Sequence, residues 1–397
     1  VPVTGGEAVV MTAGGSSASE PRWSPDGRYL SFLSDRAKGT DQIFVLDRRG
    51  GEARQLTDVK QGIEAHEWSP DGKHLVLVIE DPDPDASADA DKDTNNDEEV
   101  PKPWVIDRLQ IKNDDEGYLD RRRNHIYVFT LENKELRQIT FGDYEDSEPV
   151  WSPDGRWIAF ESYRRGSLDV YVMSTTGQQL RRFTTESAPS YGPAWSPDSR
   201  AIAFTSFRDG NADIYVRFLE RHEGLVNVTN SPDLDEDAPA WSPDGTQLAY
   251  VSGPRGNPSI QVTTFDLDTL TADQAQTELF GAGTSPAWAP DGQNLIYAVE
   301  RGGRSTLVTA STTGWALFHE VYSTDGPLDD LTWTSLPLSP RVVARAQADV
   351  PMEEPALYVE LAQPTPVAAP PYGLVPLPNV NDGEETFLSD RVNESLN

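Results

Sequence analysis

The sequence predicts an all-β protein, a seven-bladed β-propeller made of four-stranded antiparallel blades. The chain has 397 residues, more than the roughly 100 to 200 of one ordinary domain. A Trp-Ser-Pro-Asp-Gly motif or a close variant recurs in it, beginning at Trp23, Trp68, Trp151, Trp195, Trp241 and Trp288, with a degraded copy near Trp333. The spacings are 45, 83, 44, 46, 47 and 45 residues. Because a propeller blade repeats every 40 to 50 residues or so, the longest spacing is one blade with an insertion.

Each unit contains sequence for four strands. The first ends in the tryptophan, and the second follows the Ser-Pro-Asp-Gly turn, as in 157–162, 201–206 and 247–252. The third is rich in β-branched and aromatic residues, as in 42–46, 125–129, 169–173 and 213–217. The fourth is 54–57, 137–140 or 181–184. Four strands per repeat are typical of a propeller blade.

The repeated motif has a structural explanation. Proline presets φ in a tight turn, aspartate accepts hydrogen bonds from the backbone, and glycine tolerates positive φ. Ser199 replaces the glycine in the fourth unit, which predicts a more strained turn or another turn type. The tryptophan is expected to fill the space between neighbouring blades. We therefore interpret these residues as structural: Trp23, Asp26, Trp68, Asp71, Trp151, Asp154, Trp195, Asp198, Trp241, Asp244, Trp288 and Asp291.

The chain ends predict how the ring closes. The seventh unit supplies three strand-like segments, 331–333, 341–345 and 356–360, and then becomes rich in proline and alanine. The segment 7–12 has strand character but no unit of its own. We expect it to complete the seventh blade and remove exposed sheet edges. The propeller would then span residues 1–361, and residues 362–397 would be a proline-rich linker and the start of a following segment.

The insertion in blade two, about 80–124, changes sign along its length. Residues 80–99 hold ten acidic residues and one lysine, and are expected to form a solvated loop. Asp81, Asp83 and Asp85 alternate, but the glycine and glutamate of an EF-hand loop are missing. The basic residues Arg108, Arg121, Arg122 and Arg123 follow. They either pair with nearby carboxylates or line a channel and bind a carboxylate.

Composition excludes several classes of function. The chain has no cysteine and five scattered histidines, and Lys+Arg 33 against Asp+Glu 65 gives a net charge of -32. Thiolate and histidine metal centres are therefore not expected, and neither a metal nor a cofactor is predicted. A strongly acidic chain repels nucleic acid and anionic lipid. No apolar run is long enough to span a membrane, so a protein or peptide is the expected partner; the oligomeric state is left open.

Two resemblances divide the chain. Segments 22–34, 55–62, 102–108, 118–123 and 142–149 resemble the amino-terminal propeller of prolyl oligopeptidase-family serine peptidases, of the acylaminoacyl or dipeptidyl-peptidase type, over about residues 5–155. From about 156 to 360 the repeats resemble TolB-type, WD40-like propellers. All seven lysines fall within the first 134 residues, and a fusion of two propeller halves is one interpretation.

The resemblance to peptidases implies a propeller that filters substrates for an α/β-hydrolase domain. Such a domain needs a Gly-x-Ser-x-Gly nucleophile elbow, and this sequence contains none. No catalytic residue is predicted. The first hypothesis is a non-catalytic TolB-like scaffold that binds protein or peptide, and the alternative is the gating propeller of a peptidase without its hydrolase domain. The first implies a periplasmic or extracellular setting and the second a cytoplasmic one, so the compartment is left open.

Overall fold

The computed structural model describes residues 11–12, 17–37, 39–82, 112–113, 117–118, 122–220, 224–254, 258–269, 271–272, 277–312, 318–325, 328 and 331. The chain divides into two compact units, Val1–Glu353 and Glu354–Asn397. All the described residues lie in the first unit. The domain boundary at residue 361 remains a prediction.

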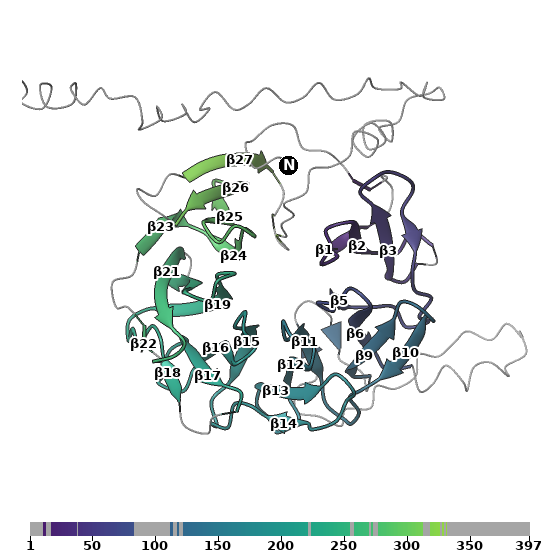
Figure 1. The fold of residues 1–397 in the computed structure, drawn as a ribbon, viewed down its shortest axis with the longest axis horizontal. Helices are drawn as coiled ribbons and strands as arrows, with labels where there is room; N and C mark the ends of the chain where they lie inside the picture. Colours follow the sequence, from purple (N-terminus) through teal and green to yellow (C-terminus); the bar gives the residue numbers. More distant parts are fainter. Residues whose placement is uncertain are drawn as a thin grey trace, which may run out of the picture. The chain divides into compact units, whose positions relative to one another are not determined.

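Six antiparallel sheets form the first unit, and Figure 1 shows them arranged about a common centre. Blades 1 to 3 contain β1 Ser19–Trp23, β2 Tyr29–Ser34, β3 Gln42–Asp47 and β4 Arg54–Gln55; β5 Ala65–Trp68, β6 His74–Glu80, β9 Asn124–Thr130 and β10 Glu135–Gln138; and β11 Asp146–Trp151, β12 Trp157–Ser162, β13 Asp169–Ser174 and β14 Arg181–Arg182.

Blades 4 to 6 contain β15 Ser190–Trp195, β16 Ala201–Ser206, β17 Asp213–Phe218 and β18 Leu225–Asn227; β19 Asp235–Trp241, β20 Gln247–Gly253, β21 Ser259–Asp266 and β22 Thr271–Ala272, with β23 Thr277–Ala282 also paired to β21; and β24 Thr284–Trp288, β25 Asn294–Arg301, β26 Arg304–Ser311 and β27 Phe318–Thr324. A separate two-stranded sheet pairs β7 Lys112–Asn113 with β8 Gly117–Tyr118.

The prediction of seven blades is wrong, because the described residues form six blades. The degraded repeat near Trp333 reads Trp-Thr-Ser-Leu-Pro and lacks the turn motif that all six blades share in some form. The sixth sheet is completed by β27 of its own unit rather than by a strand from the amino terminus. Residues 7–10 and the segments 341–345 and 356–360 lie outside the described residues. Met11 is described, belongs to no strand, and packs against Phe32, Phe44 and Leu46 of blade 1.

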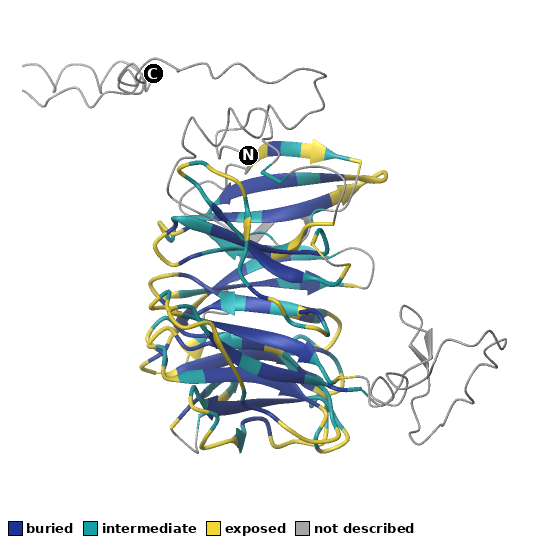
Figure 2. Ribbon diagram, turned by 90° about the vertical axis from the view of Figure 1, so that its right-hand side faces the viewer, coloured by how far each residue is buried: buried dark blue, intermediate teal, exposed yellow. Residues whose placement is uncertain are grey.

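The core lies between successive blades. Burial is highest on the second and third strands of each blade, and exposed residues gather at the turns (Figure 2). Four of the six buried residues of β16 pair with β-branched or aromatic residues on β17, as in the pair Phe204 and Tyr215. These aromatic rings stack at 6.0 Å. The buried faces stabilise adjacent blades through removal of apolar surface from water.

A repeated threonine closes the outer edge of four blades. Its hydroxyl accepts a hydrogen bond from a backbone N–H near the start of the third strand, at 2.8 to 3.1 Å; the donor is the second residue of that strand, or the third in blade 2. The four threonines are Thr57, Thr140, Thr184 and Thr229. We call this interaction the threonine clasp. It satisfies a buried donor where the fourth strand has become too short to do so.

The innermost strands carry a second repeated feature, a β-bulge just before the tryptophan. In five blades a residue with positive φ precedes a proline, namely Glu20, Glu148, Gly192, Ala238 and Ser285. The register shifts at this point in each of the five strands. Strand β5 has His66 in place of the proline and keeps a regular register. The bulges turn local side chains toward the centre of the ring.

Candidate functional site

The turn aspartates form local hydrogen bonds. In blade 1, Ser24 Oγ and the backbone N–H of Arg28 both donate to Asp26 Oδ1, at 2.6 and 3.0 Å. These bonds, with that from Ser24 the stronger, lower the pKa of Asp26. The same pattern recurs at Asp71, Asp154, Asp198 and Asp244, and in blade 6 Asp291 accepts from two backbone N–H groups. The aspartates are therefore already committed to the turns.

Ser199 keeps the turn geometry of the glycines that it replaces. Its φ is 62°, against 63° at Gly27 and 73° at Gly245. The turn is of the same kind, and the serine adopts a backbone conformation that L-residues disfavour. Its hydroxyl accepts a hydrogen bond from the backbone N–H of Asp154 in the preceding blade, at 3.0 Å. This contact offsets part of the cost.

Five motif tryptophans lie between neighbouring blades. Trp68, Trp151, Trp195, Trp241 and Trp288 each pack against the apolar cluster of the preceding blade. The indole N–H groups of the last three donate to main-chain carbonyls of the preceding blade at 2.9 to 3.2 Å. Trp23 is half-buried. Trp23 lies in the first blade, and it belongs to none of the apolar clusters among the described residues.

The basic cluster of the insertion is only partly described. Arg122 forms an ion pair with Glu80, and Arg123, 8% exposed, lies 2.9 Å from Asp143 Oδ1. Arg108 and Arg121 lie outside the described residues. Two of the four arginines thus pair with carboxylates of their own chain, and a role in binding an external carboxylate remains a prediction.

The structure brings together a group of acidic residues that the sequence did not single out. Glu67 on β5, Glu148 on β11 and Asp237 on β19 occupy innermost strands, which lie nearest the centre in Figure 1. Glu161 on β12 and Tyr191 on β15 lie close enough to the group to be affected by its charges. We call these five residues the axial carboxylate cluster. Glu148 and Asp237 are exposed and Glu161 is buried.

Two members of the cluster hold backbone groups of the next blade. Glu161 accepts from the backbone N–H of Gly192 at 2.8 Å, and Glu67 from that of Trp151 at 3.1 Å. The pKa of both carboxyl groups is raised to about 7, mainly by burial, and the charge of Glu148 contributes to the rise in each. For Glu161 the charge of Asp237 acts in the same direction. The cluster therefore gains negative charge as the pH rises through 7.

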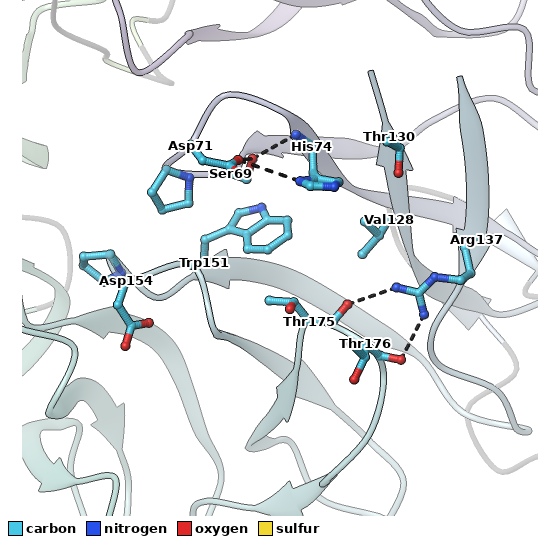
Figure 3. Close-up of a pocket in the computed structure, with 13 residues that line it drawn as sticks. Ser69, Asp71, His74, Val128, Thr130, Arg137, Trp151, Asp154, Thr175 and Thr176 are labelled. Carbon is cyan, nitrogen blue, oxygen red and sulfur yellow. Dashed lines mark hydrogen bonds and ion pairs between the residues drawn. The ribbon is translucent and has the colours of Figure 1, made fainter. Parts of the chain in front are cut away.

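A cavity of about 510 Å³ lies between the turns of blades 2 and 3. Figure 3 shows the Trp151 indole between the Ser69–His74 turn and Thr175. The Trp151 N–H has no hydrogen-bond partner, although the side chain is only 7% exposed. Arg137 at the edge donates to the carbonyls of Thr175 and Thr176, at 3.0 and 2.9 Å. A cavity of about 740 Å³ occupies the equivalent place between blades 1 and 2.

Within the described ranges, no group of three or more His, Asp or Glu side chains is placed to hold a metal ion. Asp83 and Asp85, from the alternating acidic segment, lie outside those ranges. No helix in the same part of the chain is long and apolar enough to cross a membrane.

Sequence reasoning missed the axial cluster because its members come from four blades. One local signal was present: Glu148 lies just before the proline that marks the bulge, and Glu67 lies just before the motif tryptophan. These positions face the centre only once the strands are placed around an axis. Neither cavity was foreseen, for the same reason.

Comparison with known proteins confirms both resemblances. Residues 184–324 match the model of the TolB beta propeller domain. The chain is 31% identical over 159 residues to the "Uncharacterized peptidase YuxL" of Bacillus subtilis; the match covers 40% of this chain and 24% of that protein. The chain therefore spans about a quarter of the length of this relative.

Solved structures agree on the fold. Acylaminoacyl peptidase of Pyrococcus horikoshii is 17% identical, with a TM-score of 0.54 over 77% of this chain and 45% of the peptidase. Oligogalacturonate lyase of Vibrio parahaemolyticus is 13% identical, with a TM-score of 0.56 over 78% of this chain and 80% of the lyase. At these identities the similarity establishes the fold alone. Residues 184–324 thus match the TolB beta propeller domain, and the described part of the chain has a β-propeller fold.

Proposed function

We propose that this propeller is a non-catalytic binding domain that recognises cationic groups of peptides or proteins at its axis. The observation that carries the proposal is the axial carboxylate cluster, in which carboxylates from blades 2, 3 and 5 lie close enough for their charges to interact. Glu148 and Asp237 are the exposed members and would contact the ligand. Glu67 and Glu161 lie beside them and add charge at neutral to basic pH.

Arg22 is a counter-charge beside the cluster, and its positive charge acts to lower the pKa of Glu67 against the effect of burial. Arg22 is itself held by Glu20, with Nη2 at 2.6 Å from Oε2. Acid therefore exceeds base in this region, and a Lys, Arg or free amino group supplies the complementary charge. An ammonium or guanidinium group can also donate several hydrogen bonds to carboxylate oxygens.

The test is binding of a fluorescein-labelled Ala-Arg-Ala-Arg-Ala peptide, followed by anisotropy, with a Gln-for-Arg peptide as the control. The arginine peptide is expected to bind, and to bind more weakly at pH 6 than at pH 8 because Glu67 and Glu161 take up protons. Glu148→Gln combined with Asp237→Asn should weaken binding at least about tenfold.

The matched control is Glu300→Gln combined with Asp233→Asn, which removes the same charge from exposed positions outside the cluster. Equal binding of the two peptides, or an equal loss in the control variant, would refute recognition at the axis.

A second candidate is that the same propeller admits substrates to a serine peptidase domain. The 31% identity to a curated peptidase favours it. Labelling of the 397-residue chain with a fluorophosphonate probe separates a catalytic chain from a binding one. No labelling is expected, and stoichiometric labelling of a serine would show that the chain is itself catalytic.

A further inference from the structure

The cavity between blades 1 and 2 has an apolar interior. Its lining includes Tyr29, Val45 and Leu56 from blade 1 with Trp68 and Leu131 from blade 2. Trp68 is 9% exposed and its indole N–H donates to Ser31 Oγ at 2.8 Å, so this tryptophan needs no further partner. The volume, about 740 Å³, falls in the range of small-ligand sites, about 300 to 1,000 Å³.

The acidic residues around this cavity already have partners. Asp26 and Asp71 accept the hydrogen bonds of their turns. Asp47 lies 3.2 Å from Arg28 Nη2 and 2.7 Å from Arg49 Nη2. Asp47 is thus paired with two cations, and one oxygen each of Asp26 and Asp71 is committed to its own turn.

The two remaining charged residues of the lining are cations, and they are unpaired. The side chains of Arg54 and Lys134 have no hydrogen bond or ion pair within the described part of the chain. The equivalent of Arg54 in the next blade is Arg137, whose guanidinium is held by two carbonyls of blade 3. In blade 2 the turn facing Arg54 instead carries Lys134, at a φ of 56°. The positive charge of Lys134 repels the Arg54 guanidinium, and this disfavours the kind of contact with backbone carbonyls that Arg137 makes.

We propose that this cavity binds a carboxylate that is borne on an apolar group, as at the carboxyl-terminal residue of a peptide. Arg54 and Lys134 would bind the carboxylate, and the apolar interior would take the adjoining side chain. An exposed guanidinium and an exposed ammonium group in the lining of one largely apolar cavity match this chemistry. The proposal uses no residue of the axial cluster, so either proposal can fail without the other.

The probes are acetyl-Ala-Leu with a free carboxylate and acetyl-Ala-Leu-amide, which differ only in the charged group. Titration calorimetry on the 397-residue chain should show binding of the acid, and binding of the amide at least tenfold weaker. Raising the salt concentration should weaken binding of the acid. Arg54→Gln and Lys134→Gln should each weaken it several-fold, and the double variant at least tenfold.

Lys73→Gln is the control, because it removes one exposed positive charge near the same turn without lining the cavity. Both substituted cations are exposed, so melting temperatures should stay close to that of the parent chain. Glu148→Gln with Asp237→Asn should leave acid binding intact, which separates this site from the axial one. Equal binding of acid and amide, no binding at millimolar probe, or an equal effect of Lys73→Gln would each overturn the proposal.

Discussion

The interface between blades 2 and 3 and that between blades 4 and 5 share one turn motif and one tryptophan, yet the first contains a cavity of about 510 Å³ and the second an apolar cluster. At the cavity, three equivalent positions hold His74, Thr130 and Thr175. Between blades 4 and 5 the corresponding positions hold Ala201, Phe218 and Phe265, which join Trp241 in one apolar cluster. The repeat therefore sets the position of each blade, and a few residues outside the motif decide whether the interface is filled.

The tryptophans should show the largest difference. Trp241 packs edge-on to Phe265 at 5.5 Å and donates to a carbonyl of the preceding blade, whereas the Trp151 N–H is unpartnered beside a cavity. Trp241→Ala should cost about 3 to 5 kcal/mol. Trp151→Ala should cost at least about 1 kcal/mol less, since it breaks no hydrogen bond. Denaturant unfolding of both variants measures this, and equal losses would contradict the comparison.

A pH-dependent effect should follow at Glu161, which joins blades 3 and 4. Its pKa in the folded state is raised from 4.5 to about 7. Between these values the folded protein keeps a proton that the unfolded chain has released, so stability falls as the pH rises through this window. Glu161→Gln should remove a penalty of up to about 3 kcal/mol at pH 8. Melting at pH 5 should show little difference, and Glu300→Gln, at an exposed position, is the control.

The turn of blade 4 should show a smaller effect. Ser199→Ala keeps the unfavourable positive φ and loses the hydrogen bond from the N–H of Asp154, so it should cost about 1 kcal/mol. Ser199→Gly loses the same bond but relieves the backbone, and should stay within about 0.5 kcal/mol of the parent. Chemical denaturation of both variants separates the contribution of the hydrogen bond from that of the backbone strain. If the glycine variant were clearly less stable than the parent chain, the lost hydrogen bond would outweigh the relieved backbone strain.

The smallest expected effect comes from filling the hollow interface. Thr175→Leu places at the cavity the residue type found at the equivalent position, Leu219, in the filled interface between blades 3 and 4. Added apolar burial should raise stability by about 0.5 to 1 kcal/mol. The predicted gain is tested by the melting temperature of Thr175→Leu, and Thr312→Leu, at a position outside the cavity, is the control. A destabilised Thr175→Leu variant would mean that the cavity cannot accept the side chain.

The most successful sequence predictions came from the repeated turn motif. Trp-Ser-Pro-Asp-Gly fixes a strand end, a turn and the next strand within a few residues, so the four-stranded antiparallel blade was predictable. The number of blades was not. The count of seven depended on a copy near Trp333 that had lost the turn residues, and on pairing between opposite ends of the chain. Contacts between distant segments are the part that local propensity leaves undetermined.

The candidate sites were less predictable than the fold. The basic cluster was noticed because its residues are adjacent in sequence, yet Arg122 and Arg123 form ion pairs within the chain. The axial carboxylates are separated by 81 to 89 residues from Glu67 to Glu148 and from Glu148 to Asp237. Such groups become recognisable only when blades are placed around an axis. The free cations Arg54 and Lys134 likewise acquire meaning only from the cavity that they share.

The threonine clasp has a consequence for how such a protein could have grown. The donor and the acceptor belong to the same blade. A blade encoded by a duplicated gene segment would therefore form this hydrogen bond at its outer edge without help from another blade. The hydrogen bonds from the indole N–H groups, in contrast, join one blade to the preceding one. Because their acceptors are main-chain carbonyls, any preceding blade can supply them. Tandem duplication could therefore lengthen the array without a new closing device for each copy.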